Sequence, residues 1–242
     1  MNTKILSFFI EKITEPFKLL KIDRFTDYES LPWTPASRDN FERMVSSTFD
    51  LDIRFKGSIG DIVDDIDYRY LKRFFGSIWK PRTEEFGFTG WGIVDEVNSH
   101  NPRSVLDVGC GFNQFKEKIP NLIGIDPFNP NADYMLDILD YDTDDRYDAI
   151  LVFGSINFND YADIDARIFQ VVKLLAQGGR IYFRANPGVQ HVVATGALYE
   201  GPWVDVFPWS LEYATHFAEK YNLELETFKE DSNTRLYFVM KK

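Results

Sequence analysis

Cysteine is nearly absent from this sequence of 242 residues, which contains only Cys110. One thiol cannot close a disulfide bond within the chain, and no cysteine cluster suggests a zinc site. We therefore expect no metal centre and a reducing compartment, the cytoplasm. With 44% hydrophobic and 27% charged residues, the composition is that of a folded globular protein and excludes a disordered or fibrous chain.

Basic residues and long apolar runs are also scarce. The chain has 27 Lys and Arg against 38 Asp and Glu, a net charge of −11, of which residues 91–242 carry −10. A protein that neutralises phosphates needs clustered cations, so this balance disfavours a nucleic-acid partner. The apolar run at residues 5–10 ends at Glu11 and Lys12. It is far shorter than the roughly 20 residues of a spanning helix, and we expect no membrane span.

Residues 1–88 have the pattern of helices joined by loops. Apolar side chains recur at helical spacing from Ile5 to Leu20 and again over residues 61–75, and Ser37 is expected to cap a further helix. We predict a helical N-terminal extension, residues 1–88, that covers the site. Its first helix should pack on the rest of the chain or on a second subunit, so a homodimer through these helices is one expected arrangement.

From residue 89 onward, short and nearly continuous apolar runs alternate with helical stretches. This pattern is typical of a parallel sheet covered on both faces. The last two runs are separated only by residues 229–234, too few for a crossover of about a dozen residues, so this pair should be antiparallel. The seven predicted strands are residues 104–108, 122–125, 132–136, 147–153, 180–185, 223–228 and 235–240.

The most informative segment is residues 105–113, with the sequence VLDVGCGFN. An apolar strand containing Asp107 leads into Gly-x-Gly and then, we expect, a short helix. The glycines let the backbone approach a nucleotide-like ligand, and the helix N–H groups face that ligand. Asp126 ends the second predicted strand nineteen residues after Asp107. A carboxylate at that place can accept hydrogen bonds from ribose hydroxyls.

This segment resembles the first motif of the class I S-adenosylmethionine-dependent methyltransferases, and the resemblance extends over residues 91–242. It implies a Rossmann-like, three-layer α/β sandwich with a seven-stranded, mostly parallel sheet whose last strand is antiparallel. It also implies S-adenosylmethionine as the cofactor. The implied contacts to the methionine part of the cofactor are Asp107, Gly109, Cys110 and Gly111. Asp126 is expected at the ribose, with Pro127 and Phe128 next to it and Phe128 over the adenine. Asp137 and Ile138 are expected at the adenine, and Phe153 at the end of the fourth strand.

Two features depart from that family. Asn113 stands where a third glycine is common. Because asparagine tolerates left-handed backbone better than most residues, we expect the turn to survive. Only residues 127–131 separate the second and third predicted strands, so the helix normally found between them is reduced to a loop.

Methyl transfer from a sulfonium is an in-line displacement that can be accelerated by positioning and by exclusion of water. A universal catalytic residue is therefore not expected. A histidine is the natural general base by its pKa, where one is needed. The candidates on the acceptor side are Ser155 and Asn157 in the loop after the fourth strand, Tyr199 and Trp203 in the aromatic insertion of residues 186–209, and His191 as a base.

The predicted function is an S-adenosylmethionine-dependent methyltransferase acting on a small molecule or a protein. The Gly-Ser-Ile-Asn sequence of residues 154–157 does not resemble the corresponding loop of enzymes that methylate DNA bases. A nicotinamide-dependent oxidoreductase would have a glycine at position 114, where this chain has Gln114. The alternative is a non-catalytic S-adenosylmethionine-binding or assembly module that keeps the fold, because fold alone does not imply function.

Overall fold

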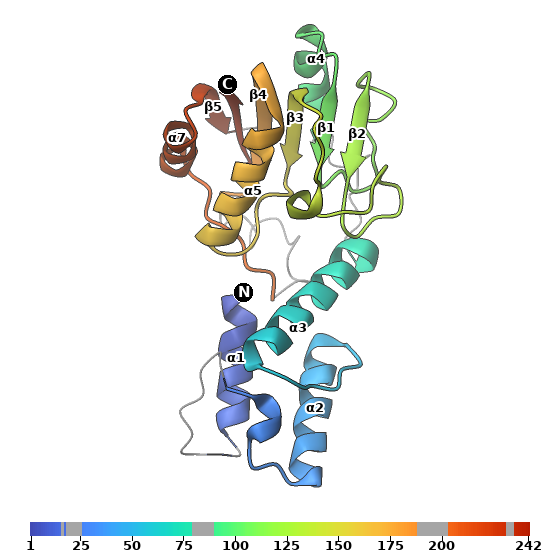
Figure 1. Ribbon diagram of the computed structural model, residues 1–242, viewed down its shortest axis with the longest axis vertical. Helices are drawn as coiled ribbons and strands as arrows, with labels where there is room; N and C mark the ends of the chain where they lie inside the picture. The colour runs from blue at the N-terminus through green and yellow to red at the C-terminus, as the bar shows by residue number, and fades with distance from the viewer. Residues whose placement is uncertain (16, 18–25, 79–89, 188–202, 231–234) are drawn as a thin grey trace. The chain divides into compact units, whose positions relative to one another are not determined.

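A computed structural model describes residues 1–15, 17, 26–78, 90–187, 203–230 and 235–242 (Figure 1). The chain forms two compact units. The helical unit consists of residues 1–74 together with 201–205, and the sheet unit of residues 75–200 together with 206–242. The predicted division after residue 88 falls in a stretch outside the described residues, and it stays a prediction.

In its described residues, the helical unit contains three α-helices, α1 (Thr3–Thr14), α2 (Pro35–Phe49) and α3 (Ile59–Arg73). The spacing predicted for the first helix is confirmed up to Ile13, which is fully buried together with Ile5 and Phe9. Thr34, not Ser37, is the N-cap of α2. Ser37 lies three residues further on and accepts a hydrogen bond from the Thr34 N–H, completing a capping box. Homodimerisation through these helices stays a prediction.

Aromatic rings form the core of the helical unit. Phe9 meets Phe41 edge to face at 5.2 Å and Phe55 at 5.6 Å, and Tyr28 packs on the same group. Such edge-to-face pairs add to the free energy gained by burying each ring. Among the described residues, no helix of either unit is long and apolar enough to cross a membrane.

Among the described residues, the sheet unit is built on six strands in the order β2-β1-β3-β4-β6-β5. Figure 1 labels all of them except β6. Neighbours from β2 to β4 are parallel, and β6 is antiparallel to both β4 and β5, as predicted for the last pair. The strands are β1 (Val105–Val108), β2 (Leu122–Ile125), β3 (Tyr147–Phe153), β4 (Leu175–Ala185), β5 (Glu224–Glu230) and β6 (Leu236–Lys241).

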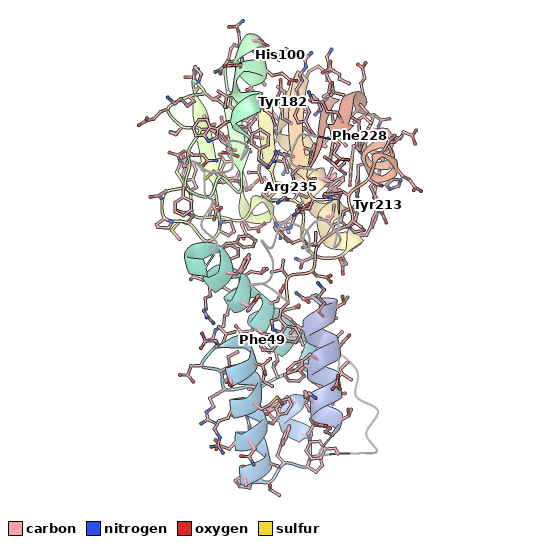
Figure 2. All side chains as sticks on the ribbon, turned by 180° about the vertical axis from the view of Figure 1, so that it is seen from behind. Phe49, His100, Tyr182, Tyr213, Phe228 and Arg235 are labelled. Carbon is pink, nitrogen blue, oxygen red and sulfur yellow. The ribbon has the colours of Figure 1, made fainter. Side chains whose placement is uncertain are left out.

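Alternate residues of each strand point to opposite faces of the sheet, so both faces are apolar and helices pack on both. Residues of α4 (Trp91–Ser99) share one apolar cluster with Leu151 and Tyr182. Residues of α5 (Tyr161–Leu174) and α7 (Leu211–Lys220) share the other with Ile150 and Ile181. The hydroxyl of Tyr182 lies 3.1 Å from Nδ1 of His100, just past the end of α4 (Figure 2). The three-layer α/β arrangement is therefore confirmed.

The prediction of seven strands is wrong for residues 132–136. This segment makes one bridge to β2, between Tyr134 and Ile125, and then leaves the sheet. Three consecutive side chains in it, at positions 133–135, are exposed. The five residues that precede it are too few to carry the chain back for a parallel strand, which needs a crossover of about a dozen residues. The segment instead caps the outer edge of β2.

Candidate functional site

The turn after β1 is shaped by residues with left-handed backbone. Gly109, Gly111 and Asn113 have φ angles of 70°, 53° and 55°, which confirms the conformation expected of Asn113. A Cβ atom on Gly109 would lie 2.2 Å from Cβ of Ser155, so only glycine fits at that position. The loop after β3 therefore lies directly against the glycine turn.

The helix predicted after this turn is not present. Residues 111–118 form successive turns, in which the Asn113 N–H donates to the Cys110 carbonyl at 2.9 Å and the Lys116 N–H donates to the Asn113 carbonyl at 3.2 Å. Two left-handed residues, Gly111 and Asn113, interrupt the right-handed path of an α-helix. A helix N-terminus therefore does not contribute to this part of the site.

Gly124 and Asp133 support the turn from the side of β2, and neither was predicted from the sequence. A Cβ atom on Gly124 would lie 2.5 Å from Oδ1 of Asn113. The Asp133 carboxylate accepts hydrogen bonds from the Gly124 N–H and from Nζ of Lys116, each at 2.7 Å. Burial opposes the charge of Asp133, but these bonds outweigh it and lower its pKa. A glycine inside a strand is itself a sign of close backbone approach, so Gly124 could have been found.

Asp126 connects the end of β2 to the glycine turn. Its Oδ2 accepts a hydrogen bond from the Gly111 N–H at 3.0 Å, and its Oδ1 accepts from the N–H groups of Phe128 and Asn129 at 2.8 and 2.9 Å. A carboxylate has roughly four acceptor directions, so about one remains, on Oδ2. The side chain is 9% exposed. The predicted ribose acceptor is thus also a structural link between two loops.

Asp107 lies next to this link at the end of β1. Its side chain is 2% exposed, and its Oδ2 has no hydrogen-bond partner among the described residues. Burial, and secondarily the negative charge of Asp126, raise the pKa of Asp107 to about 7. The neighbouring Cys110 thiol is buried as well, and burial together with the nearby carboxylates raises its pKa, so this thiol is not a nucleophile.

The residues predicted at the adenine have protein partners. The ring of Phe128 is stacked with that of Phe75, with centroids 6.2 Å apart. Asp137 begins the short 3-10 helix Ile138–Asp140, and its two carboxylate oxygens accept hydrogen bonds from Arg167 of α5 at 2.7 and 2.8 Å. The Ile138 side chain is buried in the core. Asp137 is therefore both a helix cap and half of an ion pair.

The loop after β3 carries two buried polar groups without partners. Oγ of Ser155 and Nδ2 of Asn157 make no hydrogen bond within the described part of the chain. Asn157 is fully buried, and its Oδ1 accepts a hydrogen bond from the N–H of Asn186, which follows β4. Arg235, just before β6, donates in turn to Oδ1 of Asn186 (Figure 2). Three segments thus meet at the carboxyl ends of β3 and β4.

Phe153, at the end of β3, contacts the ring of Phe115 edge to face at 5.6 Å. A Cβ atom on Gly90, which precedes α4, would lie 2.5 Å from the Phe153 ring. This ring therefore packs against the segment that leads into α4. Pro127 follows Asp126 in the loop after β2 and is partly exposed.

The structure does not bring every predicted site residue together. Asp107, Gly109, Gly111, Asp126 and Ser155 are joined through the contacts above. Trp203 belongs to the helical unit, where its ring meets those of Phe8 at 5.0 Å and Phe49 at 4.9 Å (Figure 2 labels Phe49). Its carbonyl accepts a hydrogen bond from Nδ2 of Asn2 at 2.7 Å. His191 and Tyr199 lie outside the described residues.

Solved structures share this fold. A methyltransferase from Burkholderia thailandensis, the 1,6-didemethyltoxoflavin-N1-methyltransferase solved with 1,6-didemethyltoxoflavin and S-adenosylhomocysteine, aligns with a TM-score of 0.58 and 11% identity over 78% of this chain and 92% of its own. The N-methyltransferase NodS from Bradyrhizobium japonicum, solved with S-adenosylhomocysteine, aligns with a TM-score of 0.53 and 17% identity over 72% and 97%. No family model and no curated protein matches the sequence. The chain has the fold of class I S-adenosylmethionine-dependent methyltransferases.

Proposed function

We propose that this protein binds S-adenosylmethionine and transfers its methyl group to a small molecule or a protein. One observation carries the proposal. Two buried carboxyl groups, Asp107 and Asp126, stand at the carboxyl ends of adjacent parallel strands, and a turn in which only glycine fits at position 109 runs between them. In open α/β sheets, ligands bind at the carboxyl ends of the strands.

The residues present fit the proposed cofactor. Oδ2 of Asp107 is a buried acceptor without a partner among the described residues, and Oδ2 of Asp126 keeps an acceptor direction for one ribose hydroxyl. Gly109 and Gly111 have no side chains, so at these two positions only the backbone of the turn meets a ligand. Phe128, Asp137 and Ile138 are proposed for the adenine, although Arg167 already occupies the Asp137 carboxylate. When bound, the cofactor supplies an electrophilic methyl group on a sulfonium.

The chain's own contribution to the reaction is positioning and exclusion of water. Ser155 and Asn157 are proposed to face the acceptor, because each has a buried polar atom without a partner in the described part of the molecule. Tyr199 is proposed for the acceptor pocket and His191 for a general base. The Burkholderia protein of similar fold is solved with a small molecule, which supports a small acceptor.

A non-catalytic S-adenosylmethionine-binding or assembly module is the second candidate. It is favoured by the hydrogen bonds that Asp126 and Asp137 already make within the protein. The two candidates differ in one measurement. Bound S-adenosylmethionine should be converted to S-adenosylhomocysteine when a mixture of small molecules and proteins is added to the enzyme, whereas a binding module would leave it intact under every condition.

Binding is tested by calorimetry with S-adenosylmethionine, S-adenosylhomocysteine and NAD. We expect both adenosyl ligands to bind with micromolar dissociation constants and NAD not to bind. Asp126→Ala should weaken both by about tenfold or more, roughly 1.4 kcal/mol, because it removes the ribose acceptor and the link to Gly111. Asp148→Ala, at the opposite end of the sheet beside Arg103, is the matched control and should leave affinity unchanged.

Binding of NAD alone would refute the proposal. Unchanged affinity in Asp126→Ala would show that the ribose lies elsewhere. Because Asp126 also holds the loops after β1 and β2 together, the unfolding transition of each variant is recorded beside its affinity, so that loss of folded protein is not mistaken for loss of binding.

A further inference from the structure

Asp107 is enclosed by the elements that form the site. It pairs in register with Gly124 of β2 on one side and with Leu151 of β3 on the other, and it is 2% exposed. One of its carboxylate oxygens, Oδ2, lacks a hydrogen-bond partner within the described residues. This oxygen is neither solvated nor paired, which strongly disfavours the charged form of the carboxyl group.

The charged and titratable groups around Asp107 are acidic. Asp126, beyond the end of β2, is the one charged group that acts on it in the described part of the chain. The adjacent Cys110 thiol is influenced by Asp107, Asp126 and Asp133 together. Asp133 is neutralised by Lys116, whereas no cation of the described segments acts on Asp107. This end of the sheet therefore combines negative charge with an uncompensated buried carboxyl group.

We infer that Asp107 is a charge-sensing residue, protonated in the ligand-free protein below neutral pH and ionised when a positively charged cofactor binds. The inference rests on the proposed function and extends it to the difference between substrate and product. The O–H bond of the Asp107 carboxyl breaks and its proton passes to solvent as the sulfonium arrives. After methyl transfer the sulfur is a neutral thioether, and Asp107 takes a proton back from solvent. Asp107 thus favours the charged cofactor and promotes release of its neutral product.

The pH dependence of relative affinity tests this inference. Only the fraction of protein with ionised Asp107 is competent for the sulfonium, and burial with the Asp126 charge raises the pKa of Asp107 to about 7. The ratio of S-adenosylmethionine affinity to S-adenosylhomocysteine affinity should therefore rise by about tenfold from pH 6 to pH 8. The α-amino and carboxylate groups common to both ligands cancel in this ratio. Asp107→Asn should abolish the rise, and Asp148→Asn should retain it.

Proton release on binding gives a second readout, measured on the unaltered protein. It tests the inference even if Asp107→Asn does not fold. Calorimetry at pH 7 in buffers of different ionisation enthalpy should show release of about half a proton with S-adenosylmethionine and much less with S-adenosylhomocysteine. A ratio independent of pH together with equal proton release for the two ligands would overturn this inference alone. Failure of both ligands to bind at every pH would overturn the proposed function, and this inference with it.

Discussion

Glu42 of the helical unit and Asp107 of the sheet unit are each 2% exposed, yet their surroundings differ. Glu42 accepts hydrogen bonds from Nε of Arg38 at 3.1 Å, from Nη1 of Arg54 at 2.8 Å and from the Phe55 N–H at 3.3 Å. Burial opposes its charge, but these partners outweigh burial and lower its pKa. Asp107 has no cationic partner among the described residues, and its pKa is raised to about 7.

The difference separates a structural acid from one that we propose to be functional. A buried carboxylate with two guanidinium partners is fixed in one charge state and holds a helix to its neighbouring loop. A buried carboxyl group without a cation can change its charge state near neutral pH, which is typical of functional sites. Within the described residues, the buried side-chain atoms without hydrogen-bond partners all belong to the sheet unit. Three of these atoms, on Asp107, Ser155 and Asn157, lie at the carboxyl ends of its strands.

The largest expected effect follows from the turn beside Asp107. Gly109→Ala would place Cβ 2.2 Å from Cβ of Ser155 and would force an alanine to a φ of about 70°. Left-handed backbone costs about 1–2 kcal/mol and overpacking about 1–3 kcal/mol, so we expect the free energy of unfolding to fall by about 3 kcal/mol. Denaturant unfolding measures this loss, and calorimetry should show cofactor binding reduced with it.

A second substitution separates the two causes. Ser155→Gly removes the Cβ atom that a methyl group at position 109 would meet. The double variant, Gly109→Ala with Ser155→Gly, should therefore regain the stability lost to overpacking and keep only the loss caused by the left-handed backbone. Gly92→Ala is the matched control, because a Cβ there meets nothing within 4 Å. On α4 this change should raise stability by about 0.5–1 kcal/mol. Equal stability losses for Gly109→Ala and the double variant would show that Ser155 is not the obstacle.

Glu42→Ala should have a smaller effect, confined to stability. It leaves Arg38 and the Phe55 N–H without their acceptor, and we expect a loss of about 2 kcal/mol in the free energy of unfolding. Asp39→Asn removes an exposed carboxylate that also contacts Arg54, and it should cost less than about 0.5 kcal/mol. At denaturant concentrations below its unfolding transition, Glu42→Ala should bind the cofactor with the same affinity as the unaltered protein. Weakened affinity in folded Glu42→Ala would contradict the separation of structural from functional acid.

The features predictable from sequence are those set locally. The Gly-x-Gly turn follows a continuous apolar strand, and the antiparallel β5–β6 pair is dictated by a connection too short for a crossover. Helix spacing placed α1 and α3 because three to four residues separate apolar side chains on one face. Asp126 was singled out because an acidic residue at the end of a second strand has a recurrent chemical use, and the structure links it to the glycine turn.

The features that were not predicted depend on contacts distant along the chain. The helix after the glycine turn fails because Gly111 and Asn113 are both left-handed, and Asn113 is fixed there by Asn131, eighteen residues away. The missing third strand reflects a connection too short for a parallel crossover. The engagement of Asp137 by Arg167, thirty residues away, could not be read from local pattern.

Measured over one pH unit, the smallest expected effect is the opposite pH dependence of the two acids, which is also their most direct comparison. The pKa of Asp107 is raised from 3.8 to about 7 by folding, so the folded state binds this proton more tightly than the unfolded state. Stability from this group therefore falls as pH rises from about 4 to about 7, by at most about 1.4 kcal/mol per pH unit. Asp107→Asn cannot ionise, and its stability relative to the unaltered protein should increase across that window and level off above it.

Glu42 has the reverse sign. Its pKa is lowered from 4.5, so the stability that it contributes is present above its unfolded pKa and is lost as pH falls through its folded pKa. Glu42→Gln should therefore differ most from the unaltered protein at neutral pH and converge with it in acid. Urea unfolding of the three proteins at intervals between pH 2 and pH 8 measures both slopes. The pH ranges over which the two groups change stability lie mostly on different sides of about pH 4.5. Parallel curves of stability against pH for the two variants would therefore show that the two carboxyl groups are equivalent. A reversed slope for Asp107→Asn would show that Asp107 is charged in the free protein.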